Sequence, residues 1–119
     1  MFKVIQILTG TELPCEVAVG RGFRIDHCAG IVISGFASFG EHCILRNGVT
    51  VGLRRVTEPS APKVGNYVDI GAGAKILGNI TIGDHVTVGA NAVVLEDVPS
   101  HSIAVGVPAK IIKRNGYEL

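Results

Sequence analysis

A large aliphatic residue recurs at every sixth position over much of this chain. From residue 64 onward the spacing is regular, at Val64, Ile70, Ile76, Ile82, Val88 and Val94. Gly follows directly at four of these six positions. A helix repeats every 3.6 residues and a strand every 2, so a period of six fits neither as one unbroken element. The pattern predicts short strands joined by tight turns, with the aliphatic side chain pointing inward and Gly or a small polar residue at the corner.

Three sides of six residues close a triangular coil of eighteen, and stacked coils pair each strand with the strands above and below it. The register continues backwards through Val51, Leu45, Phe39, Ile33, Ile25 and Val19, which gives twelve inward positions in four coils. It fails twice, because eight residues separate Ile25 from Ile33 and thirteen separate Val51 from Val64. Insertions in a stacked coil bulge outward, and loops on a rigid scaffold often carry function. We therefore expect surface loops at residues 25–33 and 53–63.

The composition fits a single all-β domain over residues 1–119, with a lead-in at 1–14, coils at 15–97 and a C-terminal cap at 98–119. Hydrophobic residues make up 47% and aromatic residues only 5%, which predicts a narrow interior lined by small branched side chains. The net charge of +1 gives no sign of a nucleic-acid partner, and no apolar run is long enough to span a membrane. Cys15, Cys28 and Cys43 show no CxxC spacing, which favours reduced thiols in a cytoplasmic protein.

The eight-residue break, IDHCAGIV, contains His27. A neutral imidazole can remove a proton from a substrate hydroxyl near pH 7. A surface histidine without a role is the alternative. The regular pattern fails at this residue, which favours a functional side chain.

The segment GRGFRIDHCAGIVI resembles the part of the serine acetyltransferase family that holds its catalytic histidine. Residues 65–112 resemble the C-terminal half of the same family, and the similarity extends over about residues 11–113. This resemblance implies a left-handed parallel β-helix, the hexapeptide-repeat solenoid. It also implies transfer of an acetyl group from acetyl-CoA to a hydroxyl of serine or a serine-like small molecule. His27 matches the general base of that reaction.

The resemblance also implies roles for two acidic residues, Glu12 and Asp26. The family has an Asp fifteen residues before its catalytic histidine, and Glu12 stands at that place here. A Glu can accept the same hydrogen bond from the imidazole Nδ1, and a solvated acid in the lead-in is the alternative. Asp26 matches a residue near the amino-acid substrate, although an Asp in a turn can equally cap the backbone.

The second break, LRRVTEPSAPK, departs from the family. It ends in SAPK where the family reads RHPK, so Ala61 replaces a histidine of the substrate site. Arg54 and Arg55 are candidates to bind a substrate carboxylate or the phosphates of CoA, with solvated loop arginines as the alternative. The N-terminal helical domain of the family also has no counterpart in these 119 residues. Both departures leave a sugar or polysaccharide precursor open as the acceptor.

By the same resemblance, CoA lies in a groove parallel to the coils, between neighbouring subunits of a homotrimer. The candidate contacts are coil corners, where Gly permits close approach, and lysines able to meet phosphates. These residues are Gly71, Ala72, Gly89, Ala90, Lys75 and Lys110. Ordinary corner residues and solvated lysines are the alternative.

Two further classes use solenoids of this kind. A zinc-dependent γ-type carbonic anhydrase needs three suitably spaced histidines, and no two of the four histidines form an HxxxxH pair. We therefore expect no metal. A catalytically inactive scaffold is the second class, and His27 in its break is the feature that such a scaffold does not require.

Overall fold

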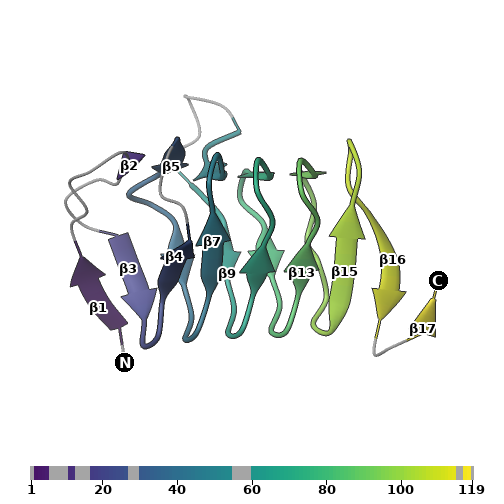
Figure 1. Cartoon of the computed structure of the whole chain (residues 1–119), viewed down its shortest axis with the longest axis horizontal. Helices are drawn as coiled ribbons and strands as arrows, with labels where there is room; N and C mark the ends of the chain where they lie inside the picture. Colours follow the sequence, from purple (N-terminus) through teal and green to yellow (C-terminus); the bar gives the residue numbers. More distant parts are fainter. Residues whose placement is uncertain are drawn as a thin grey trace.

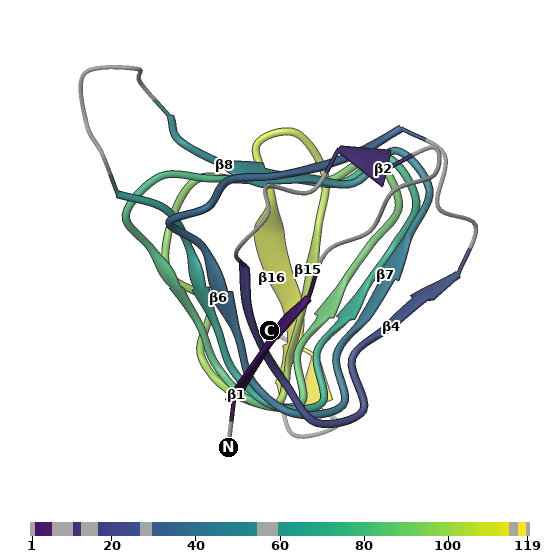
Figure 2. The ribbon, with the colours of Figure 1, turned by 90° about the vertical axis from the view of Figure 1, so that its left-hand side faces the viewer.

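The computed structural model describes residues 2–5, 11–12, 17–26, 30–54, 60–114 and 117–118. These residues form short strands and turns, and none of them is helical (Figure 1). No helix in the described part of the chain could therefore cross a membrane. Viewed along the long axis, the strands form three flat sides of a triangular solenoid (Figure 2).

We name the three sides in the order in which the parallel strands visit them, starting from β2. Face I contains β2 (Thr11–Glu12), β5 (Ile31–Ile33), β8 (Thr50–Gly52), β11 (Lys75–Leu77) and β14 (Val93–Val94). Face II contains β1 (Phe2–Ile5), β3 (Val17–Gly20), β6 (Ser38–Phe39), β9 (Lys63–Val64) and β12 (Thr81–Ile82). Face III contains β4 (Arg24–Asp26), β7 (Ile44–Arg46), β10 (Asp69–Ile70), β13 (Thr87–Val88), β15 (Ser102–Val105), β16 (Lys110–Arg114) and β17 (Tyr117–Glu118).

Strands of successive coils pair in parallel, as the period of six predicts. On face III, for example, Leu45 pairs with Ile25 on one side and with Ile70 on the other. Antiparallel pairing occurs at the two ends, where β1 pairs with β3 and β16 lies between β15 and β17. The parallel coil also continues beyond Val94, because Val98 bridges to Ile82 and Ala104 pairs with Val88.

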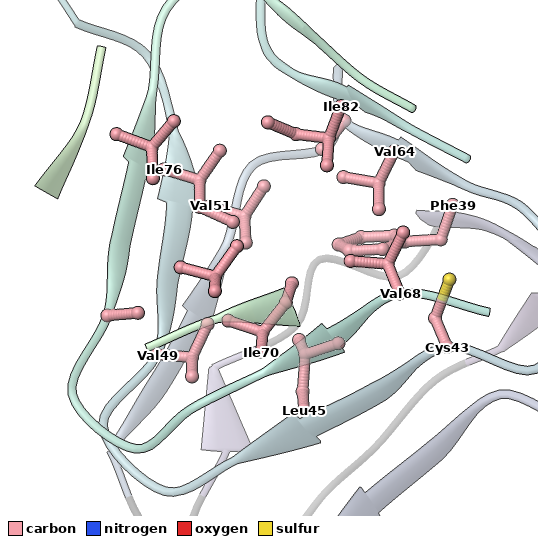
Figure 3. Packing of buried hydrophobic residues seen from close by; sticks show 14 of the residues in the cluster. Phe39, Cys43, Leu45, Val49, Val51, Val64, Val68, Ile70, Ile76 and Ile82 are labelled. Carbon is pink, nitrogen blue, oxygen red and sulfur yellow. The ribbon is translucent and has the colours of Figure 1, made fainter. Parts of the chain in front are cut away.

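The predicted inward positions form the core (Figure 3). Eleven of the twelve are at most 5% exposed, and Ile25 is partly buried against the cluster. A second inward position, two residues earlier, is also buried in the ten cases from Ile33 onward, as at Ile31, Cys43, Val68 and Val86, and Phe23 before Ile25 is partly buried. The interior is therefore filled from every strand by alternate side chains, as in any half-buried sheet.

The corner between faces II and III carries a stack of exposed rings that runs from coil to coil. The rings of His42, Tyr67, His85 and His101 stack with centroids 4.9–5.0 Å apart and interplanar angles of 2–16°. All four residues have positive φ, between 56° and 60°, so the same left-handed turn repeats in each coil. Beside them, the Asn66 and Asp84 side chains each accept a backbone N–H from the preceding coil at 2.7 Å. This corner is a structural ladder that joins the coils.

Candidate functional site

His27 falls in the connection from face III to face I. β4 ends at Asp26 and β5 begins at Ile31, so the connection crosses the corner between these faces, which we call the III/I corner. Residues 27–29, with the imidazole of His27, lie outside the described residues. The structure therefore places the backbone on both sides of His27.

Glu12 belongs to a strand beside the one that follows His27. β2 pairs in parallel with β5, and Glu12 is the Cα partner of Val32, a half-exposed residue. Among the described strands, β2 and β4 are the last members of faces I and III. Glu12 and Asp26 thus both lie in the N-terminal coil, one on each face that meets at the III/I corner. Their side chains lie outside the described residues.

Sequence reasoning missed an ion pair on the face III side of this corner. The guanidinium of Arg46, on β7, pairs with the carboxylate of Asp69, on β10. Asp26 is the Cα partner of Arg46. The two ion-paired residues lie 23 positions apart, and the long insertion lies between them. Aligning the coils across that insertion is the only signal that could have found the pair.

Two later coils present the predicted Gly-Ala turns at the same III/I corner. A Cβ atom at Gly71 would lie 2.7 Å from the Ala90 amide nitrogen, and one at Gly89 would lie 2.8 Å from a methyl carbon of Val105. Coil stacking therefore requires glycine at Gly71, where the nearest atoms are backbone, whereas at Gly89 the closest contact is the end of a side chain. The amide N–H groups of Ala72 and Ala90 have no hydrogen-bond acceptor among the residues that the structure describes. They remain available to a ligand that lies along the corner.

The side chain of Lys75 is hydrogen-bonded to the backbone of this corner. Its ammonium group donates to the carbonyl oxygens of Gly48 at 3.1 Å and Gly73 at 3.0 Å. The ammonium group therefore links the turns of two successive coils. A contact between Lys75 and a CoA phosphate stays a prediction.

A groove of about 520 Å³ lies at the C-terminal end of the solenoid. Its lining comes from four parts of the chain and includes both cations and acids: Arg54, residues 94–98, Ala104 and residues 108–111. Arg54 and Lys110 are exposed, so the groove offers two positive side chains to an anionic ligand. The stem of Arg54 passes over Gly78, where an added Cβ atom would lie 3.4 Å from the Arg54 Cβ. The structure thus brings Arg54 and Lys110 together.

The 53–63 segment lies at a different corner from His27. It connects β8 on face I to β9 on face II, whereas His27 lies between faces III and I. Figure 2 shows β4 and β8 on different sides of the triangle. Ala61 is 4% exposed and so presents no side chain to a ligand, and Arg55 lies outside the described residues. Within one subunit, Arg54 and the segment containing His27 are on separate edges.

The remaining candidates are thiols and metal ligands. Cys43 is a buried free thiol whose Sγ contacts the Gly65 carbonyl oxygen at 3.1 Å, and burial raises the pKa of this thiol. Cys15 and Cys28 lie outside the described residues. Across the described ranges, no three His, Cys, Asp or Glu side chains form a group that could hold a metal ion. His27 is outside those ranges, so the absence of a metal site stays a prediction.

Known proteins resemble this chain in both sequence and structure. Residues 61–96 match the family model described as bacterial transferase hexapeptide (six repeats). The serine acetyltransferase of Synechococcus elongatus is 44% identical over 96% of this chain and 47% of its own length. That of Helicobacter pylori strain J99 is 42% identical over 95% of this chain and 67% of its own length.

Two solved structures extend the similarity to three dimensions. Soybean serine acetyltransferase complexed with serine has a TM-score of 0.77 and 43% identity, over 81% of this chain and 40% of that one. A serine acetyltransferase in complex with CoA has a TM-score of 0.76 and 43% identity, over 81% of this chain and 39% of that one. This chain spans about half the length of the first two curated relatives, at 47% and 55%. The chain belongs to the serine acetyltransferase family, and its solenoid is a left-handed parallel β-helix.

Proposed function

We propose that this protein is an acetyl-CoA-dependent O-acetyltransferase that acts on serine or a serine-like hydroxyl compound, with His27 as its general base. The observation that carries the proposal is the composition of the III/I corner. His27 interrupts the regular coil between β4 and β5, and later coils at the same corner present the free amides of Ala72 and Ala90. Family relatives have been solved with CoA and with serine.

The corner provides a track for an extended acyl carrier. Strands in a sheet are spaced about 4.8 Å apart, so the four steps from β4 to β15 cover roughly 19 Å. Amide groups along a pantetheine arm can accept hydrogen bonds from exposed backbone N–H groups such as those of Ala72 and Ala90. An arm lying along this corner would bring the thioester toward the N-terminal coil, where His27 follows β4.

The proposed reaction needs a single base. The neutral imidazole of His27 takes the proton of the acceptor hydroxyl as its oxygen attacks the thioester carbonyl carbon. The carbon–sulfur bond then breaks, the acetyl group stays on the acceptor oxygen, and the imidazolium returns its proton to the CoA thiolate. Glu12 is proposed to hold the imidazole through Nδ1, and Asp26 to contact the acceptor.

The groove at the other end of the solenoid offers two cations to an anionic ligand, and Glu96 and Asp97 also line it. Arg54 and Lys110 lie in its lining, and phosphate groups are common partners of paired cations. We assign the nucleotide phosphates of CoA to these side chains. Arg55, Gly71, Gly89 and Lys75 stay candidate contacts, although Gly71 and Lys75 each have a structural reason to be present.

The separation of the 53–63 segment from the III/I corner supports a homotrimer. One subunit places the 53–63 segment and the segment containing His27 on different edges of the prism, so a neighbouring copy must supply one of them to a shared site. Flat faces of this kind pack readily around a three-fold axis. Light scattering at micromolar concentration should give the mass of a trimer, and a monomer would contradict this assignment. A cytoplasmic location is favoured by the reduced, buried thiol of Cys43.

The acceptor itself has two candidates. Serine is favoured by the family relatives, and a sugar hydroxyl by the loss of the family's substrate-site histidine at Ala61, which is buried here. The same loss also fits an inactive scaffold, although a scaffold does not explain the break at His27.

The test is release of free thiol from acetyl-CoA in the presence of serine, homoserine and a panel of nucleotide sugars. We expect thiol release by the wild type with at least one acceptor, and its loss in His27→Ala. His42→Asn is the matched control, because it removes an exposed imidazole at another corner from a position with φ of 58° that Asn tolerates. If the wild type and His27→Ala release thiol equally with every acceptor, the enzymatic proposal is wrong.

A further inference from the structure

An ion pair joins two strands of face III next to the III/I corner. The Nη1 atom of Arg46 pairs with Oδ1 of Asp69, and Nη2 lies 3.4 Å from Oδ2 of the same carboxylate. Nη1 also lies 3.4 Å from the carbonyl oxygen of Ile70. The guanidinium is therefore held at both terminal nitrogens by β10, although Arg46 itself belongs to β7. Such a fork-to-fork arrangement fixes the orientation of the guanidinium plane.

Among the described strands, the one before His27 is paired on one side only. β4 is the last strand of face III among those described, and it pairs only with β7. Edge strands have half of the ladder hydrogen bonds of a central strand, so their ends open more readily. Because β4 ends at Asp26, any opening of this end moves the residue that follows it, which is His27.

The register places a charged residue, Arg46, beside the end of β4. Asp26, the last residue of β4, is the Cα partner of Arg46. Asp26 and Arg46 are thus adjacent in the register of two neighbouring parallel strands, an acidic residue beside a basic one. Arg46 is thus flanked by an acidic position in the coil before it and by Asp69 in the coil after it.

We propose that Arg46, anchored by Asp69, is a positioning residue that holds the end of β4 and thereby the backbone that carries His27. This inference rests on the proposed role of His27. Arg46 acts through β4 and does not touch the reacting atoms. A displacement of about 1 Å at a reacting group can lower a rate by roughly a hundredfold, so a clamp at this point has a measurable consequence.

The competing explanation is an ordinary surface ion pair. The Arg46 and Asp69 side chains are 34% and 41% exposed, and pairs of this kind contribute little to stability. Such a pair would leave the dynamics of β4 and the catalytic rate unchanged when it is removed. The two explanations therefore differ in local exchange and in kcat.

The first test uses hydrogen–deuterium exchange of the whole protein and needs no activity. We expect Arg46→Gln and Asp69→Asn each to raise exchange roughly threefold or more in the peptide covering residues 24–31, with exchange across β13 to β15 unchanged. Lys63→Gln is the matched control, because Lys63 is an exposed cation on face II, and its exchange should match the wild type throughout. Unchanged exchange of residues 24–31 in Arg46→Gln overturns the inference.

The second test separates positioning from simple charge pairing. In the thiol-release assay, Arg46→Gln should lower kcat by about 10- to 100-fold with the KM for acetyl-CoA unchanged. The charge swap Arg46→Asp with Asp69→Arg restores an ion pair but places two acids side by side in the register, so it should not restore kcat. Recovery of kcat in the swap, or an unchanged kcat in Arg46→Gln, refutes the positioning role. If the wild type releases no thiol while exchange rises in Arg46→Gln, the clamp stands and the proposed enzymatic function fails.

Discussion

Two glycines at the same place in the repeat should respond in opposite ways to one added methyl group. Gly52 follows the inward residue Val51, and Gly71 follows the inward residue Ile70. A Cβ atom at Gly71 would lie 2.7 Å from the Ala90 nitrogen and 2.9 Å from the Gly89 carbonyl carbon. These are backbone atoms of the next coil, so the strain cannot be relieved by rotating a side chain. Among the described residues, a Cβ atom at Gly52 would find its nearest neighbour at 3.9 Å, an ordinary contact.

The size of the difference follows from these contacts. Overpacking a tight interior costs about 1–3 kcal/mol, and Gly71→Ala belongs at the upper end because coil spacing itself must change. Neither glycine has a positive φ, so an alanine side chain adds no backbone strain at either position. Gly52→Ala should instead gain about 0.4–1 kcal/mol, because alanine restricts the unfolded chain more than glycine does. The two variants should therefore differ by roughly 2–4 kcal/mol in free energy of unfolding.

Equilibrium unfolding in urea measures both variants. Wild type and variants must be compared at one protein concentration, since subunit association would raise the apparent stability. Equal stability of the two variants would show that the coils adjust their spacing without cost. That result would refute the steric requirement for glycine at the stacked corners.

Three further outcomes follow from single contacts. Tyr67→Ala removes two ring stacks and should lower the free energy of unfolding by about 1–3 kcal/mol. Tyr67→Phe keeps the ring and should change this free energy little. A double-mutant cycle with His85 that shows no coupling energy would contradict the stacking explanation. Burial raises the pKa of Cys43, so the folded state keeps a proton that the unfolded state loses above about pH 8.5. Stability should therefore fall as the pH rises beyond that value, and Cys43→Ala should remove this alkaline loss in a urea titration at several pH values. Lys75→Met leaves two corner carbonyls without their donor and should cost about 1–2 kcal/mol in the same urea assay, while an unchanged stability would show that water replaces the ammonium group.

The period of six was sufficient to predict most of the core. Inward positions in a stacked coil are filled by apolar side chains at a regular spacing. Residues such as Phe39 and Ile76 can therefore be assigned to the core from their size and spacing alone. The register could not predict that the coil continues past Val94. The step to Val98 is four residues instead of six, and only parallel pairing with Ile82 reveals that Val98 occupies the next side.

Contacts between coils were beyond the reach of the sequence for a different reason. The Arg46–Asp69 pair and the ring stack at His42, Tyr67 and His85 join residues on neighbouring coils. Their sequence separations change wherever a loop intervenes. Outward positions also tolerate many side chains, so identity at such a position carries no signal until the neighbouring coil is aligned. The polar neighbours of the candidate site are therefore found only from strand register.

The regular corners show why residue type alone cannot identify a ligand site in this fold. Gly71 and Gly89 were candidate CoA contacts because glycine permits close approach, yet the next coil already approaches each of them closely. Gly83 meets the same restriction from Ser100 at a corner for which no ligand is proposed. The N–H groups of Ala72 and Ala90 are a different signal, because coil stacking leaves both without an acceptor among the described residues. In a solenoid, the hydrogen-bonding groups that the repeat does not satisfy are better guides to a ligand than the residues that the repeat requires.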